Sequence, residues 1–108
     1  MIQKEQVMDM IIKACLSYKN RYSIYLKDNY EVGEERLLYV DITDFIDHMF
    51  ERYQKRCIEE LDKVFDCIEE LHLNGDDYVK EWATIGFLEI FRTNYYERIL
   101  SLMNLIFI

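Results

Sequence analysis

The chain contains no proline and only three glycines in 108 residues. Proline interrupts helices and glycine weakens them, while the turns of sheet proteins depend on both residues. A chain so poor in them favours long helices over a turn-rich sheet protein. Apolar residues make up 51% of the sequence, which is enough for one hydrophobic core at this length and argues against disorder. The sequence therefore predicts a single all-α domain that spans residues 1–108.

Hydrophobic periodicity divides this domain into five or six short helices in one compact bundle. We expect the first helix over about residues 3–17. Residues 18–32 fit either a short helix or a strand, because the tyrosines of YSIYL suit both, and the helical context favours a helix. Gly33, followed by Glu34 and Glu35, predicts the start of the next helix, since acidic residues in a first turn interact favourably with the helix dipole.

Two central helices share one pattern, an apolar stripe with acidic residues on the opposite side. In the first, the stripe comprises Leu38, Ile42, Phe45, Ile46, Met49 and Tyr53, and the outward side carries Asp44, Asp47, His48 and Glu51. In the second, the stripe comprises Cys57, Leu61, Val64, Phe65, Ile68 and Leu71, and the outward side carries Glu59, Asp62, Asp66, Glu69 and Glu70. No glycine or proline separates the two helices, but a compact domain of this size favours a break near residues 54–57.

The last third of the chain contains a helix boundary and one unusually apolar helix. Asn74-Gly75 predicts a helix end, and Asp76-Asp77 can cap a following helix over about residues 77–91. A final helix can begin at Thr93 or Asn94. The helix of residues 77–91 is apolar over more than half of its circumference, which predicts a central position in the bundle.

Two residues in this apolar helix, EWATIGFLEIF from residue 81 to 91, require an explanation. Gly86 lies one turn after Ala83 and four residues after the expected core residue Trp82, so it allows another helix to approach closely. Glu89 is expected to point into the apolar arc, where a carboxylate must have a partner or reach solvent. Arg92 is the nearest candidate, and Arg98 or a tyrosine hydroxyl could also serve.

The chain is acidic, with a net charge of −8, and residues 41–70 alone carry −6. A negative field of this kind repels nucleic acid and favours a basic protein partner, although it also serves solubility. The three cysteines are widely spaced and form no C-x-x-C motif, which indicates free thiols and a reducing compartment. No signal peptide is recognisable, and the apolar C-terminal run is shorter than the about 20 residues of a membrane span. We therefore expect a cytoplasmic protein that binds neither nucleic acid nor membranes.

Catalytic motifs are weak in this sequence. Glu69-x-x-His72 has the spacing of a helical metal-ligand pair, to which Asp44 and His48 could add two ligands if their helices aligned. A second E-x-x-H is absent, neither histidine lies in a recognisable nucleophile motif, and no glycine-rich phosphate loop occurs. The sequence predicts no catalytic residue, metal or cofactor. A metal-dependent helical enzyme that uses these four residues is the weakest alternative.

The segment VFDCIEELHLNGDDYVKEWATIGFLEIF resembles a family of small bacterial helical proteins. In that family an I-E-x-L pattern, a G-D-x-x-V turn and an A-T-x-G-F-L-E helix follow one another. The matching residues here are Ile68, Glu69, Leu71, Gly75, Asp76, Val79, Ala83, Thr84, Gly86, Phe87, Leu88 and Glu89. Members are similar to the immunity proteins of polymorphic toxin and contact-dependent growth-inhibition systems. The resemblance implies a bacterial, non-enzymatic toxin inhibitor that neutralises one cognate toxin by one-to-one binding.

This resemblance gives the acidic faces a function to be tested. Nuclease toxins have basic clefts, to which an acidic inhibitor can bind rapidly and with salt sensitivity. The predicted toxin-binding residues are Asp44, Asp47, Glu51, Glu59, Asp62, Asp66, Glu69 and Glu70. These residues could equally form ordinary solvated faces. An alternative function is a regulatory or structural domain that self-associates through an apolar helix such as residues 95–108.

Overall fold

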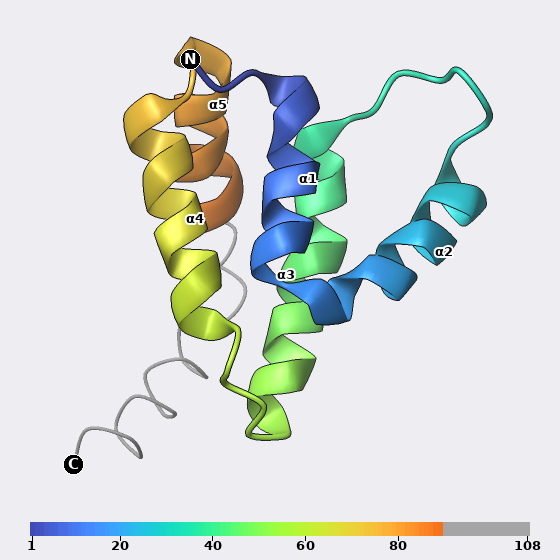
Figure 1. Cartoon of the computed structure of the whole chain (residues 1–108). Coiled ribbons are helices and arrows are strands. Elements are labelled where there is room, and N and C mark those ends of the chain that lie inside the picture. Colours follow the sequence, from blue (N-terminus) through green and yellow to red (C-terminus); the bar gives the residue numbers. More distant parts are fainter. Residues whose placement is uncertain (90–108) are drawn as a thin grey trace.

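The structure, a computed structural model, describes residues 1–89, which form helices joined by short connections and one longer loop (Figure 1). No strand occurs in this part, where one isolated bridge joins Ile2 to Gly75. The protein is all-α, as predicted. The elements in chain order are α1 (Lys4–Ala14), a 3₁₀ turn (Leu16–Tyr18), α2 (Lys19–Asn29), α3 (Leu38–Gln54), α4 (Leu61–Asn74), α5 (Asp77–Glu81) and a π-helical segment (Trp82–Glu89).

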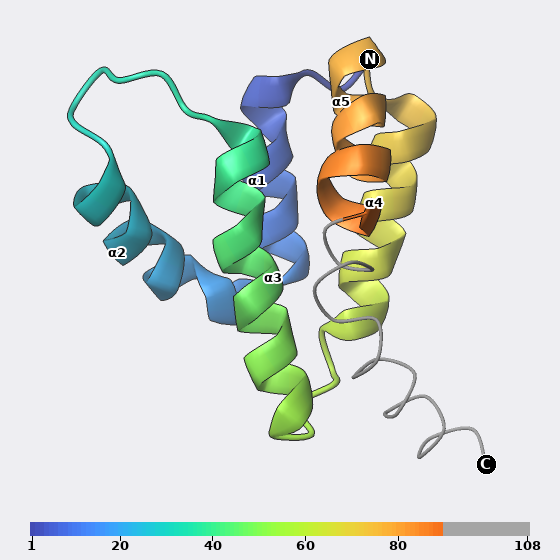
Figure 2. The same ribbon diagram turned by 180° about the vertical axis from the view of Figure 1, so that it is seen from behind.

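The helices form a small bundle with α2 at one side (Figures 1 and 2). α1 packs against α4, and the π-helical segment, which continues α5, packs against α3 and α4. These elements enclose a core whose fully buried side chains include Val7, Ile11, Ile42, Phe45, Val64, Leu71, Val79, Trp82 and Phe87. Among the described residues no helix is both long and apolar enough to cross a lipid bilayer.

Residues 19–29 form helix α2, which confirms the helical interpretation of this ambiguous segment. The preceding helix α1 ends at Ala14, before the predicted residue 17, and a 3₁₀ turn connects the two. The ring of Tyr18 is fully buried and contacts the rings of Tyr22 and Phe45. Tyrosines therefore attach this end of α2 to the core.

The predicted start of the third helix at Gly33 is wrong, because α3 begins at Leu38. Residues 31–34 form a turn in which the N–H of Glu34 donates to the carbonyl of Glu31. Gly33 has a φ of +84° in this turn, a conformation that glycine adopts readily and that a helix excludes. Glu34 and Glu35 thus lie in a loop that connects α2 to α3.

The expected break between the two acidic helices is confirmed. α3 ends at Gln54, α4 begins at Leu61, and Arg56 in the connection has a φ of +60°. Most of the two predicted apolar stripes is buried, but Phe65 is 42% exposed and belongs to the surface of α4. All three cysteines are free.

The predicted end of α4 and the cap of the next helix are also confirmed. α4 ends at Asn74, and Oδ1 of Asp76 accepts a hydrogen bond from the N–H of Val79 at 2.9 Å. Ile2 binds this turn through two backbone hydrogen bonds. The N–H of Ile2 donates to the carbonyl of Asn74, and the carbonyl of Ile2 accepts from the N–H of Asp76.

The apolar helix is central, and its glycine allows close packing. Trp82 is fully buried, and its Nε1–H donates to the carbonyl oxygen of Leu38 at 3.1 Å. A Cβ on Gly86 would lie 3.1 Å from the Trp82 ring and 3.3 Å from the Tyr39 ring of α3. This supports the expected close approach of another helix.

Glu89 does not lie buried in the apolar arc: its side chain is exposed, which is the second of the two outcomes expected for this carboxylate. The helix has π-type spacing over Trp82–Glu89, which turns the residues of this segment away from the directions that α-helical spacing gives them. Arg92, Arg98, the predicted last helix and the apolar run of residues 95–108 lie outside the described residues.

Candidate functional site

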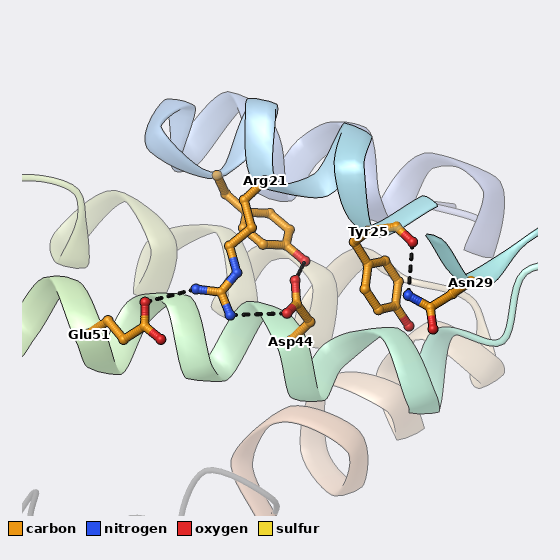
Figure 3. Close-up of polar contacts among 6 residues, drawn as sticks. Arg21, Tyr25, Asn29, Asp44 and Glu51 are labelled. Atoms are coloured by element: carbon orange, nitrogen blue, oxygen red, sulfur yellow. Dashed lines mark hydrogen bonds and ion pairs between the residues drawn. The ribbon is translucent and has the colours of Figure 1, made fainter. Parts of the chain in front are cut away.

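The acidic residues of α3 face α2 (Figure 3). Nη2 of Arg21 donates to Oδ1 of Asp44 at 3.0 Å, and Nη1 donates to Oε2 of Glu51 at 2.9 Å. The hydroxyl of Tyr18 donates to Oδ2 of Asp44 at 2.8 Å. The predicted outward orientation is therefore wrong for Asp44, which lies at the contact between two helices. Glu51 stays largely exposed but is paired.

Asp47 and His48 are also less exposed than expected. Asp47 is half-buried, and burial raises the pKa of its carboxyl, with Asp44 and Glu51 adding to the rise and Arg21 opposing it. His48 is buried. The solvent-facing acidic surface predicted on α3 is thus largely absent, because α2 covers this side of the helix.

The acidic residues of α4 lie where they were predicted. Glu59, just before the helix, and Asp62, Asp66, Glu69 and Glu70 within it are all exposed. In the described part of the chain no lysine, arginine or histidine lies within ion-pair distance of them. We call these five residues the α4 acidic face. The structure leaves its negative charge open to solvent.

Ser17 lies at the centre of a polar cluster that joins three segments. Its N–H donates to Oε2 of Glu60 at 3.0 Å and its hydroxyl donates to Oε1 of the same carboxylate. Nε2 of His48 lies 2.9 Å from the Ser17 hydroxyl oxygen, and Nη2 of Arg52 lies 3.7 Å from Glu60. The pKa of Glu60 is lowered: burial raises it, but the Ser17 hydrogen bonds and Arg52 outweigh burial.

The composition of this cluster resembles a hydrolase triad, but its connectivity does not. In a triad the imidazole stands between serine and acid and accepts the serine proton. Here Ser17 stands in the middle, and its single proton goes to the ionised Glu60. Nε2 of His48 must then donate to Ser17. The cavity beside Glu60 that the described residues line measures about 10 Å³, which is too small for a substrate, so we interpret the cluster as structural.

Asp41 is fully buried between α2, the following loop and α3. Its Oδ1 accepts hydrogen bonds from the hydroxyls of Tyr25, at 2.7 Å, and Tyr30. The Tyr30 hydroxyl also accepts from the N–H of Leu37 at 3.0 Å. Asp41 therefore holds the α2–α3 loop to the bundle. Its Oδ2 accepts no hydrogen bond from the described residues.

The four residues of the metal hypothesis do not converge. Nδ1 of His72 lies 2.9 Å from the hydroxyl of Thr84, while His48 contacts Ser17 and Asp44 contacts Arg21. Within residues 1–89, no three His, Cys, Asp or Glu side chains are grouped as metal ligands. A metal-dependent enzyme gains no support from this part of the chain.

Sequence reasoning did not find the Ser17 and Asp41 clusters, because their members lie far apart in the chain. Ser17 is 43 residues from Glu60, and Tyr25 is 16 residues from Asp41. One signal was present in the sequence. Asp41 precedes the core residue Ile42, at a position of α3 that faces the core, and a buried aspartate there requires hydrogen-bond donors from another segment.

Residues 8–105 match the model of one protein family, described as a domain of unknown function (DUF7674). The match covers most of the chain, which therefore belongs to this family. Comparison with curated proteins and with solved structures finds no match.

Proposed function

We propose that this member of the DUF7674 family is a non-enzymatic immunity protein, which neutralises one cognate toxin by one-to-one binding through the α4 acidic face. The observation that carries the proposal is the exposure of five carboxylates on and beside one helix, Glu59, Asp62, Asp66, Glu69 and Glu70, with no ion pair from the described residues. The resemblance to immunity proteins supplies the class of partner.

The spacing of the α4 acidic face suits a helical docking surface. Asp62, Asp66 and Glu69 follow one another at intervals of four and three residues, which places them along one side of the helix. Phe65 lies among them and is 42% exposed. Aromatic side chains that become desolvated supply most of the affinity at protein interfaces, while charge increases the association rate. Phe65 is the proposed anchor.

The proposed partner is the basic cleft of a nuclease toxin domain, because a cleft that binds phosphates presents lysine and arginine side chains. The proposed site of action is the cytoplasm, where such a toxin meets nucleic acid. The α3 acids are removed from the proposed interface, since Arg21 already compensates Asp44 and Glu51.

The proposal predicts that a toxin domain is encoded beside the gene of this protein, and the test uses that domain; its absence contradicts the proposal. Coexpression of the two should restore growth. In purified form, the triple variant Asp62→Asn, Asp66→Asn, Glu69→Gln should associate at least about ten times more slowly at low salt and lose most of its salt dependence. Phe65→Ala should accelerate dissociation.

A matched control separates the α4 acidic face from net charge. The triple variant Asp28→Asn, Glu31→Gln, Glu81→Gln changes the charge by the same amount at exposed positions outside α4. It should associate within about twofold of the unmodified protein. Equal slowing by both triple variants, or no rescue of growth, contradicts the proposal.

Self-association through an apolar helix is the alternative function, and the helix suggested for it, residues 95–108, lies outside the described residues. Sedimentation at several protein concentrations distinguishes the two functions, because an immunity protein that binds one-to-one needs no dimer. A concentration-dependent dimer that Phe65→Ala leaves unchanged would favour the alternative.

A further inference from the structure

A cavity of about 480 Å³ opens between α1, α2 and the loop that connects α2 to α3. α1 and α2 diverge from the 3₁₀ turn that joins them, and the loop returns from the far end of α2 to α3 (Figures 1 and 2). The cavity has an apolar floor formed by Met8, Tyr22, Leu26 and Leu38. Its volume lies in the range of small-molecule sites.

One wall of the cavity holds an arginine without a carboxylate partner. Nη1 of Arg36 donates to the hydroxyl of Tyr22 at 2.7 Å. The guanidinium carbon lies 5.9 Å from the centroid of the Tyr22 ring and 5.8 Å from that of Tyr30. Among the described residues no carboxylate pairs with Arg36. Neutral groups thus hold the guanidinium in place and leave most of its N–H donors available to an anionic group.

The α1 wall holds the opposite charge. Glu5 and Asp9 line the cavity one helical turn apart, are exposed, and have no ion pair within the described part of the chain. Lys4, also on this wall, pairs with Glu35 of the loop at 3.6 Å. Uncompensated charges of opposite sign therefore line the same apolar space and are too far apart to pair with each other.

The geometry points to a binding site for a small zwitterion with an apolar body, the class of the hydrophobic α-amino acids. Arg36 binds the carboxylate, Glu5 and Asp9 bind the ammonium group, and the apolar floor receives the side chain. A guanidinium and a carboxylate form charge-assisted, bidentate hydrogen bonds. No residue of this site lies on α4, so the inference is independent of the proposed toxin interface.

The test is calorimetric titration of the full chain with L-phenylalanine and L-leucine. Each should bind saturably, with a Kd of about 1 mM or lower. The analogue 3-phenylpropanoate lacks the ammonium group and 2-phenylethylamine lacks the carboxylate, and each should bind at least about tenfold more weakly than L-phenylalanine. If neither amino acid binds, or if one analogue binds as well as L-phenylalanine, the inference is overturned.

Substitutions locate the site. Arg36→Gln and the double variant Glu5→Gln, Asp9→Asn should each weaken L-phenylalanine binding at least about tenfold. Arg56→Gln, at an exposed arginine in the α3–α4 connection, should not change it. If Arg36→Gln loosens the loop, the double variant still tests the site. Glu5 and Asp9 are exposed on a regular helix, so their substitution should leave the fold unchanged. Unchanged binding in the double variant refutes the inference.

Discussion

Ser17 donates both its backbone N–H and its hydroxyl to the carboxylate of Glu60, a residue 43 positions later in the chain. This pair joins the 3₁₀ turn before α2 to the residue before α4. His48 of α3 contacts the same hydroxyl, so three segments meet at one serine. The contact therefore fixes how the helices are placed relative to one another.

Ser17→Ala should destabilise the fold by about 1–3 kcal/mol, because Glu60 and His48 would each lose a partner while remaining partly buried. Urea unfolding measures the loss. Ser23→Ala is the control: the Ser23 hydroxyl bonds only to the carbonyl of Lys19 in its own helix, and its removal should change stability by less than about 0.5 kcal/mol. Equal effects of the two substitutions would contradict the role of Ser17.

Tyr25→Phe should cost about 1–2 kcal/mol, since it removes one of the two donors to the buried carboxylate of Asp41. Tyr53→Phe is the matched control, because Tyr53 is half-buried and no hydrogen bond of its hydroxyl occurs among the described residues. Urea unfolding of both variants gives the comparison. A loss in Tyr53→Phe as large as that in Tyr25→Phe would show that the hydroxyl bond to Asp41 is unimportant.

The difference between α3 and α4 shows what hydrophobic periodicity can predict. Both helices have an apolar stripe with acids opposite, and for α4 this pattern predicted the exposed acidic residues correctly. α3 has the same pattern, but Tyr18 of the 3₁₀ turn and Arg21 of α2 cover its acidic side. Periodicity within one helix contains no information about a second polar neighbour. Such a neighbour can be predicted only by pairing the hydrogen-bond donors of one segment with the acceptors of another.

Local chemistry predicted helix ends well where one residue type decides them. Asn74-Gly75 and the Asp76 cap were predicted because their effects need no distant partner. The start of α3 was missed, since Gly33 supports both a helix start and a turn, and the choice depends on Tyr30 and Asp41 holding the loop. The direction of Glu89 was missed because the preceding sequence gives no sign of π-type spacing.

Stability should fall between about pH 7.5 and pH 5.5 because of His48. Burial, together with Arg21 and Arg52, lowers the pKa of His48 from its ordinary value of 6.5. The unfolded chain then binds a proton at a pH where the folded chain does not, so acid favours unfolding. This contribution is complete above pH 6.5 and declines as the pH falls toward the folded-state pKa. The pKa of Glu60 is lowered from 4.5, so its contribution is lost only at lower pH.

Urea unfolding of His48→Gln at the two pH values checks this assignment. Glutamine keeps an Nε2–H that can donate to Ser17 but does not titrate, so the pH dependence should become smaller. A pH dependence in His48→Gln as steep as that of the unmodified protein would show that the buried imidazole is not the titrating group.

Gly75→Ala should destabilise the protein more than Gly86→Ala. A Cβ at position 75 would lie 2.5 Å from the carbonyl oxygen of Leu71 and 2.5 Å from Cγ1 of Val79, so the backbone of the α4–α5 turn has to move. A Cβ at position 86 would lie at least 3.1 Å from its neighbours, and the higher helix propensity of alanine offsets that strain by about 1 kcal/mol. We expect a loss of about 2 kcal/mol or more for Gly75→Ala and a smaller loss for Gly86→Ala, measured by urea unfolding. The reverse order would mean that the turn has room for a side chain and that the close packing of Tyr39 against Gly86 limits the fold instead.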